Sequence, residues 1–406
     1  MRFDLHLRDT LREQISTVAD RMRDWEETPR LTESDCNQIR GAIQPFNHTT
    51  QVEHLSIAGV DGSGDYPCVT YGDSFVHVTV AHGTVYQANS KSGLKEVPPE
   101  SEPVIHVTWM AEQSEQRRQA WDDAFAALAS RSISQVIEQS DYRVLKAAAT
   151  NRNTSVIQLA EQLIRPHAHD SGNIAIQLRT LGELGAALRL LETHDELDYL
   201  FVDGTFSLPM VTRRDVSLFY EHLKRLCCSE ARERGVGFFA LSKSHGLPAI
   251  ELIEGLAQEK LSPPEATKAE HWYLRLPQQD HDAWQFPLAD GRHLPPIGAV
   301  TYLIRFHRNV PVLRLDMDRE YWCSHVRGES DDLTVRNEQR IFQHLDYGSH
   351  DQRCFGYPYP IKAGHDRASL TTQERVSLRK QVIDAAVARG LRRTLFRDAS
   401  MATGHR

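Results

Sequence analysis

The sequence lacks any apolar stretch long enough to cross a membrane. In its 406 residues, no run approaches the roughly 18 to 20 consecutive apolar residues of a spanning helix. Residues 1–30 carry charges throughout, where a secretory signal peptide would have an apolar centre. We therefore expect a cytoplasmic protein with no membrane partner.

Cysteine is scarce, and no two cysteines form a C-x-x-C pair. The six cysteines are Cys36, Cys68, Cys227, Cys228, Cys323 and Cys354. This scatter argues against a structural zinc site and against a disulfide framework. We expect reduced and chemically inert thiols.

An excess of positive charge is also absent, because the formal net charge is −8. Proteins that coat nucleic acid non-specifically are basic. Any DNA binding must therefore come from a local basic lining, from a partner or from metal ions. With 40% hydrophobic residues, the chain can still bury the core of one large domain or two ordinary ones.

The first part of the chain divides into three predicted regions. Residues 1–50 carry apolar side chains at helical spacing, which predicts an N-terminal helical arm. Residues 51–110 predict the first part of the core, an antiparallel meander, because strand patterns recur at 55–60, 74–81 and 104–109. Residues 111–170 predict a helical insertion.

Residues 171–406 predict the remainder of the core, in which helices and strands alternate before a C-terminal helix and a basic tail. The predicted elements are helices at 173–192, 215–227, 248–258, 334–345 and 371–389, and strands at 197–202, 236–241, 299–306 and 312–316. A loop rich in turn residues is expected around 356–360. A meander followed by alternation predicts an α/β fold with a mixed sheet and flanking helices.

Two similar signatures carry the chemistry. One predicted strand ends in Asp-Gly-Ser at Asp61, and another ends in Asp-Gly-Thr at Asp203. Each places a carboxylate at the end of a strand, with a glycine behind it that lets the backbone turn sharply. A single Asp-Gly is most often a turn, but two such signatures in one chain favour a site.

Glu183 lies on a predicted helix with a leucine stripe. Gly182 and Gly185 flank it, and each costs roughly 1 kcal/mol relative to alanine inside a helix. Close packing of this helix on a sheet would explain the glycines and would bring Glu183 near the strand carboxylates. The alternative is a solvated glutamate on the exposed face of the helix.

Three converging carboxylates would repel one another unless cations lay between them. Ligand sets made only of oxygen select hard ions such as Mg²⁺ or Mn²⁺. Two such ions about 4 Å apart can activate a water and stabilise the leaving oxygen of a phosphodiester. We therefore predict two-metal hydrolysis of a nucleic-acid backbone, with Asp61, Glu183 and Asp203 as metal ligands.

These residues belong to a set that resembles the NurA family of DNA nucleases. The matching segments, in family order between residues 52 and 388, are Ala58–Ser63, the Glu183 helix, Phe201–Thr205, Ala240–Ser244 and Tyr357–His365. The resemblance implies a ribonuclease H-like fold and manganese-dependent cleavage of single- or double-stranded DNA ends. It also implies a homodimer and a hexameric HerA-type translocase as partner, in DNA end resection and repair or in defence against foreign DNA.

The resemblance also assigns roles to further residues. His365 matches the family's C-terminal histidine, which could bind a metal or shuttle a proton. Asp366 follows it directly and is a substitute metal ligand. Lys243 matches a family lysine that could contact a phosphate oxygen, although a surface lysine is the alternative.

Other polar clusters and other functions stay open. The groups His167, His169, Asp170 and His344, Asp346, His350, Asp351 resemble metal clips, but a chain with 20 histidines produces such groups by chance. An actin-like ATP-dependent phosphotransferase could also place Asp-Gly turns after strands. A non-catalytic adaptor of a translocase ring could retain the acids of a nuclease ancestor.

Overall fold

The computed structural model divides into two compact units. It describes residues 5–25, 31–64, 67–89, 93–98, 102–111, 114–139, 171–206, 220–245, 247, 249–261, 270–276, 286–287, 293–294 and 299–397. Unit 1 comprises Met1–Ile43 and His245–Ala269, and unit 2 comprises Gln44–Ser244 and Glu270–Arg406. Among the described helices, none combines the length and the apolarity needed to cross a membrane.

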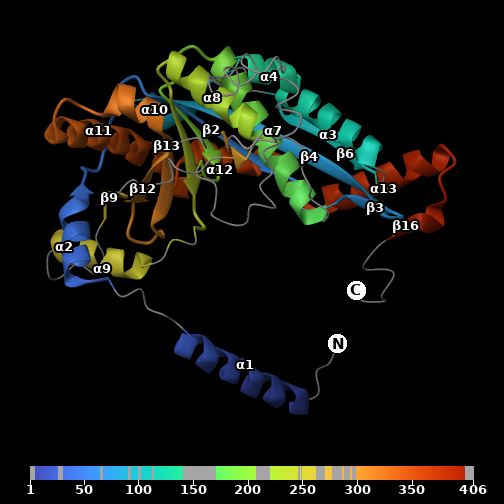
Figure 1. The fold of residues 1–406 in the computed structure, drawn as a ribbon, viewed down its shortest axis with the longest axis horizontal. Coiled ribbons are helices and arrows are strands. Elements are labelled where there is room, and N and C mark those ends of the chain that lie inside the picture. The colour runs from blue at the N-terminus through green and yellow to red at the C-terminus, as the bar shows by residue number, and fades with distance from the viewer. Residues whose placement is uncertain are drawn as a thin grey trace. The chain divides into compact units, whose positions relative to one another are not determined.

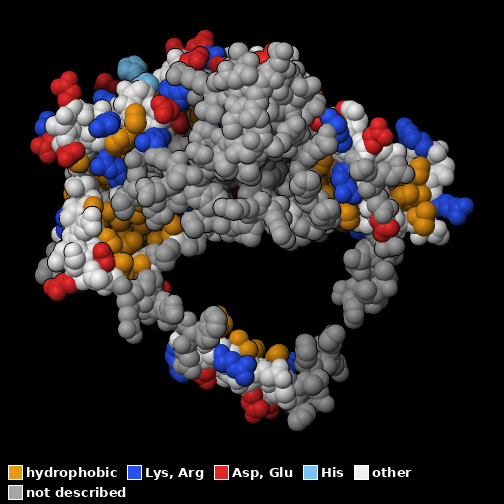
Figure 2. Space-filling view, in the orientation of Figure 1, with side chains coloured by type: hydrophobic (Ala, Val, Ile, Leu, Met, Phe, Trp, Pro, Cys, Tyr) orange, Lys and Arg blue, Asp and Glu red, His pale blue; other side chains and the backbone are white. Residues whose placement is uncertain are grey.

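Unit 1 contains helices α1 (Leu5–Trp25), α2 (Glu33–Ala42) and α9 (Ile250–Leu261). Helix α2 begins with a capping box between Thr32 and Asp35. Helix α1 lies within the region predicted as a helical arm, and Figure 2 shows apolar side chains along one of its sides and charged side chains along the other. The apolar side chains are at least 47% exposed, namely those of Leu11, Ile15, Val18 and Met22.

Unit 2 is built on a large mixed sheet (Figure 1). Its described strands follow the order β1-β9-β12-β13-β8-β7-β2-β4-β3-β16, and β5 and β6 also pair with β4. The central strands β2, β7 and β8 are mutually parallel, and antiparallel pairs extend the sheet on both sides. The strands are β1 (Ile43–Pro45), β2 (Ser56–Ser63), β3 (Val69–Tyr71), β4 (Ser74–Asn89), β5 (Gly93–Glu96), β6 (Val104–Met110), β7 (Tyr199–Asp203), β8 (Gly237–Ser242), β9 (Trp272–Arg275), β12 (Ala299–Arg305), β13 (Leu313–Asp318) and β16 (Phe396–Arg397).

The helices of unit 2 flank this sheet. Figure 1 shows α3, α4, α7 and α8 gathered together, and α7 packs on β2 and β4. The helices are α3 (Ser114–Ala129), α4 (Ile133–Gln139), α7 (Ser171–Thr193), α8 (Glu221–Glu233), α10 (Arg319–Tyr321), α11 (Asp331–Ser349), α12 (Tyr359–Ala368) and α13 (Thr372–Ala388), with a π-helical turn at Trp322–Val326 and a 3-10 turn at Arg393–Leu395. Two short hairpins are β10 (Phe286–Pro287) with β11 (His293–Leu294) and β14 (His350–Asp351) with β15 (Cys354–Phe355).

The predicted α/β class with a mixed sheet and flanking helices is confirmed, and several elements differ in their extent from the prediction. Strand β4 continues to Asn89, well past the predicted end at residue 81, because it pairs with β6 along its first half and with β2 along its second. Over its described residues 114–139, the predicted helical insertion consists of α3 and α4, and Ser130 takes a positive φ of 56° between them. Helix α12 occupies residues that were predicted as part of a loop region.

Alternation along β2 decides which helix each residue meets. Ala58 and Val60 face the core beneath α7, whereas Ile57 faces the core that includes Ile361 of α12. Gly59 lies on the α12 side, where an added Cβ would come within 2.3 Å of the Ile361 backbone nitrogen. The two helices therefore cover opposite faces of the sheet at β2, and α12 lies directly on the strand backbone.

A buried histidine in β4 makes the fold sensitive to acid. His77 is fully buried, neither ring nitrogen has a hydrogen-bond partner, and burial lowers its pKa to about 4. The unfolded chain takes up the proton near pH 6.5, so stability falls as pH drops from there towards 4. We expect His77 to lower the free energy of unfolding by about 2 kcal/mol at pH 5 relative to pH 7.

Urea unfolding at both pH values tests this expectation. His77→Leu should remove that part of the acid sensitivity, whereas His325→Leu, at an exposed histidine, should not. An unchanged pH dependence in His77→Leu would contradict the proposed cost.

Candidate active site

Asp61 lies inside β2, not at its end as the sequence predicted. It pairs with His82 of β4, but the parallel pairing with β7 stops one residue earlier, at Val60. The carboxylate therefore lies where the sheet opens between β2 and β7. It is 4% exposed, with Oδ1 accepting a hydrogen bond from the Gly62 nitrogen at 2.7 Å.

The glycines around Asp61 act differently from the prediction. Gly62 remains in the strand, and an added Cβ there would meet the Glu183 side chain at 3.0 Å. The sharp turn comes two residues later, at Gly64, with φ +133°. Gly62 thus supplies space for a second carboxylate, and Gly64 supplies the turn.

Asp203 is the last residue of β7, as predicted within one residue. Gly204 follows it with φ +137°, and its nitrogen donates to the Leu241 carbonyl at 3.1 Å. The buried Asp316 accepts a hydrogen bond from the Phe206 nitrogen at 3.0 Å, which holds the chain beyond the turn. Neighbouring β8 therefore fixes the backbone on which Asp203 is presented.

Glu183 comes from α7, whose leucine stripe is buried, and it is 4% exposed. The flanking glycines allow close packing, as the sequence predicted. An added Cβ at Gly182 would meet Thr79 of β4 at 3.1 Å, and one at Gly185 would meet the Leu128 carbonyl oxygen at 2.0 Å. Arg179, one turn earlier, places its Nε 3.5 Å from Glu183 Oε1.

His365 approaches from the opposite face, on α12. Its Nδ1 lies 2.9 Å from Asp61 Oδ2, and its Nε2 lies 3.2 Å from the Ser369 hydroxyl. Asp366, the substitute candidate, is more than half exposed and forms an ion pair with Lys362. Of the two adjacent residues His365 and Asp366, His365 is therefore the one that contacts Asp61.

Lys243 and Tyr357 complete the surroundings. Lys243 directly follows β8, and its Nζ lies 4.0 Å from the centroid of the Tyr357 ring. Tyr357 is 4% exposed, and its hydroxyl has no hydrogen-bond partner. A buried phenol without a partner is costly, so its position beside charged groups calls for a functional explanation.

Burial and neighbouring carboxylates disfavour the ionised forms of two groups at this point. Burial and the charge of Asp61 raise the pKa of Asp203, while Lys243, Arg179 and His365 act in the opposite direction. Burial raises the pKa of Tyr357 well above its usual value, and the charges of Asp203, Asp61 and Glu183 add to this. Lys243, Arg179 and His365 therefore do not fully offset the effect of burial and of Asp61 on the pKa of Asp203.

The raised pKa predicts that the ionised Asp203 destabilises the metal-free fold. Its folded-state pKa lies above the unfolded value, so the cost is absent below the unfolded pKa and complete above the folded pKa. In EDTA at pH 7, we expect Asp203→Asn to raise the Tm by about 2–4 °C. The gain should vanish near pH 3.

Differential scanning calorimetry across this pH range measures the effect. The matched control is Asp195→Asn, because the Asp195 side chain is 91% exposed. A lower Tm for Asp203→Asn at pH 7 would show that Asp203 stabilises the fold instead.

A hydrogen bond, close packing and mutual charge effects link Asp61, Glu183, Asp203, His365 and Lys243, and we call this group the acid centre. Sequence reasoning assigned no role to Arg179 or Tyr357. Arg179 could have been found from its spacing of four residues to Glu183 on the same helix face, whereas Tyr357 carried no such signal.

The other predicted clusters do not join the acid centre. His167, His169 and Asp170 lie outside the described residues. Asp346 and His350 do meet, but their neighbours are His48 and His271, not the predicted His344 and Asp351. His344 contacts the Tyr199 hydroxyl and Asp351 binds Arg353, so only Asp346 and His350 of those four residues come together.

Comparison with known proteins adds the following findings. No protein-family model and no curated protein sequence matches the chain. Among solved structures, the NurA nuclease from Sulfolobus solfataricus is similar over 96% of this chain and 99% of its own, at 12% identity and a TM-score of 0.47. A structure of NurA bound to dAMP and manganese is similar over 96% and 98%, at 10% identity and a TM-score of 0.40.

An endonuclease V structure from Ciona intestinalis is also similar, over 89% of this chain and 98% of its own, at 11% identity and a TM-score of 0.30. These three similar structures are those of nucleases. At 10–12% identity, the activity of this chain has to be inferred from its own residues.

Proposed function

We propose that the protein is a metal-dependent nuclease that hydrolyses phosphodiester bonds of DNA at the acid centre. The observation that carries this proposal is that Asp61, Asp203 and Glu183, from two strands and one helix, are close enough to act on the same neighbours: all three add to burial in raising the pKa of Tyr357, and burial followed by the charge of Asp61 raises the pKa of Asp203. Uncompensated carboxylates at one point are the arrangement that a divalent cation stabilises.

The donor set fits hard divalent ions. Asp61, Glu183 and Asp203 supply oxygen, and His365 supplies one nitrogen beside Asp61. When bound there, Mn²⁺ or Mg²⁺, as two ions, would lower the pKa of a water and offset charge on the leaving oxygen. Asp366, with its ion pair to Lys362, is left outside this set.

The chain's own residues would bind and orient the scissile phosphate. Lys243 and Arg179 provide positive charge at the rim of the acids, where a phosphodiester would otherwise be repelled. His365 is held by Asp61 through Nδ1, so its other nitrogen can exchange a proton with water or product. Hydrolysis adds one water across the P–O bond, which leaves a phosphate on one product and a hydroxyl on the other.

The finer parts of the proposal come from the NurA resemblance. They are a ribonuclease H-like core, cleavage at DNA ends, a homodimer, and a HerA-type translocase that delivers DNA for end resection, repair or defence. The parallel strands β2, β7 and β8 beside an antiparallel meander support the core assignment. A net charge of −8 is consistent with dependence on a partner or on cations for DNA binding.

The test is a nuclease assay with linear single- and double-stranded DNA in Mn²⁺, Mg²⁺ or EDTA. Cleavage that requires a divalent ion is the expected result. A protein that cleaves neither substrate, even with a cognate translocase present, would overturn the proposal and favour the non-catalytic adaptor.

A further inference from the structure

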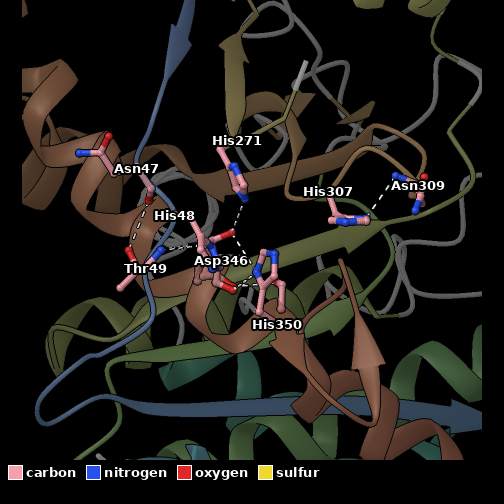
Figure 3. Close-up of polar contacts among 10 residues, drawn as sticks. Asn47, His48, Thr49, His271, His307, Asn309, Asp346 and His350 are labelled. Carbon is pink, nitrogen blue, oxygen red and sulfur yellow. Dashed lines mark hydrogen bonds and ion pairs between the residues drawn. The ribbon is translucent and has the colours of Figure 1, made fainter. Parts of the chain in front are cut away.

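A second polar cluster lies in unit 2, apart from the acid centre (Figure 3). His48 belongs to the segment that follows β1, and His271 directly precedes β9. Asp346 lies in the last turn of α11, and His350 caps that helix. The ligand atoms that these four side chains offer all lie within 4.8 Å of one another, the one such group in the part of the chain that the structure describes.

Asp346 is the centre of this cluster. His48 Nδ1 lies 2.8 Å from its Oδ2, His350 Nδ1 lies 3.0 Å from its Oδ1, and His271 Nε2 lies 3.5 Å from its Oδ1. The spacing of four residues between Asp346 and His350 places both on one side of α11. Three imidazoles therefore surround one carboxylate that is 0% exposed.

Two buried atoms in the cluster have no hydrogen-bond partner. They are Asp346 Oδ1 and His271 Nε2, which face each other across the 3.5 Å gap. His350 Nδ1 lies nearer the Asp346 backbone oxygen, at 2.8 Å, than Oδ1. Asp346 Oδ1 therefore has two imidazole nitrogens within 3.5 Å but no well-aligned hydrogen bond, and a cation between Oδ1 and His271 Nε2 would satisfy both atoms.

We propose that His48, His271, Asp346 and His350 form a tetrahedral Zn²⁺ site. Three imidazole nitrogens and one carboxylate oxygen are a donor set that Zn²⁺ accepts without cysteine. Bonds of about 2.0–2.1 Å in a tetrahedron separate neighbouring ligand atoms by about 3.3 Å. The distances of 2.8–3.5 Å from the imidazole nitrogens to the two Asp346 oxygens are close to this value, and no two ligand atoms are more than 4.8 Å apart, so side-chain movements would have to draw the imidazoles together around the ion.

The surroundings suit a closed structural site. The cluster supplies four protein ligands, which would fill all four coordination positions of a tetrahedral Zn²⁺. The Thr49 nitrogen donates to Asp346 Oδ2 at 2.8 Å, which orients the carboxylate from outside. The rings of Phe46 and Phe355 pack on His271 and His350, whereas the His48 side chain is 41% exposed and leaves an entry path.

The consequence of the site is a cross-link among distant parts of the chain. It would join the segment before β2, the start of β9 and the end of α11, which lie between 75 and 298 residues apart in sequence. A metal that closes such long loops in the folded state stabilises it by mass action. This role is independent of the acid centre and needs no DNA.

The experiment is metal analysis of the untagged full chain purified with added zinc and then dialysed. We expect about one zinc per chain by mass spectrometry, and a Tm that falls by about 5 °C after chelation and recovers with Zn²⁺. His271→Gln and His350→Gln preserve side-chain polarity but should lose the zinc. His307→Gln, at the neighbouring histidine outside the cluster, should retain it.

Asp61→Asn separates this site from the acid centre, because it should retain the zinc while losing nuclease activity. Substitution with Co²⁺ provides a second readout, since tetrahedral Co²⁺ absorbs visible light much more strongly than octahedral Co²⁺. A wild-type chain that retains no zinc, or variants that retain as much as wild type, would overturn the proposal and leave a hydrogen-bonded polar cluster.

Discussion

Asp61→Asn is expected to lower the rate of DNA hydrolysis by about a thousandfold or more under saturating Mn²⁺. Asparagine has the shape of aspartate but lacks its charge. Asp61 is buried, contacts His365, and contributes to the raised pKa of Asp203. Its charge therefore acts on two other members of the acid centre. Its neutralisation should weaken cation binding and also release the histidine.

The rate loss should occur without unfolding. Removing one charge relieves repulsion with Asp203, so Asp61→Asn should keep its circular dichroism and a Tm near that of wild type. Initial rates across a Mn²⁺ titration give the comparison, with Asp195→Asn as the exposed control. A folded Asp61→Asn protein that cleaves DNA within about threefold of the control would refute the assignment of the acid centre.

Gly59→Ala is expected to destabilise the protein by about 3 kcal/mol or more. The added Cβ would lie 2.3 Å from the Ile361 nitrogen and 2.4 Å from the Pro360 carbonyl carbon. Both obstacles are backbone atoms, so no side-chain rotation can relieve the clash. Helix α12 would have to move off β2 and carry His365 away from Asp61, so activity should fall with stability.

Thermal unfolding and the nuclease assay together measure this effect. We expect the Tm to fall by roughly 6–12 °C. Gly255→Ala is the matched control, because a Cβ there meets nothing within 4 Å and alanine favours a helix. Near-wild-type Tm and activity in Gly59→Ala would mean that α12 does not rest on the backbone of β2.

Periodicity in the sequence was sufficient for the elements with one apolar face. The leucines of α7 recur at helical spacing and so predicted a helix, and its flanking glycines predicted close packing. The strands that became β2, β6, β12 and β13 were recognised by alternation or by runs of apolar residues. Their ends were less certain, since the end of β2 depends on pairing with β4.

Helix α12 shows why local pattern failed near the acid centre. Its first turn contains Pro360 and its middle contains Gly364, two residues that usually mark loops. Proline is compatible with a first helical turn, where its missing N–H needs no partner. Gly364 is required because a Cβ there would come within 2.9 Å of the His82 carbonyl oxygen, a contact invisible in the sequence.

The sequence by itself determined the fold class and pointed to Asp61, Glu183 and Asp203, because strand ends, helical stripes and Asp-Gly turns are local features. Only the tertiary structure decided which polar residues meet. It brought Arg179 and Tyr357 to the acid centre, and it gave Asp346 and His350 the partners His48 and His271. The members of each group are far apart in sequence, and whether they come close in space depends on the packing of the whole fold, which local sequence patterns do not show.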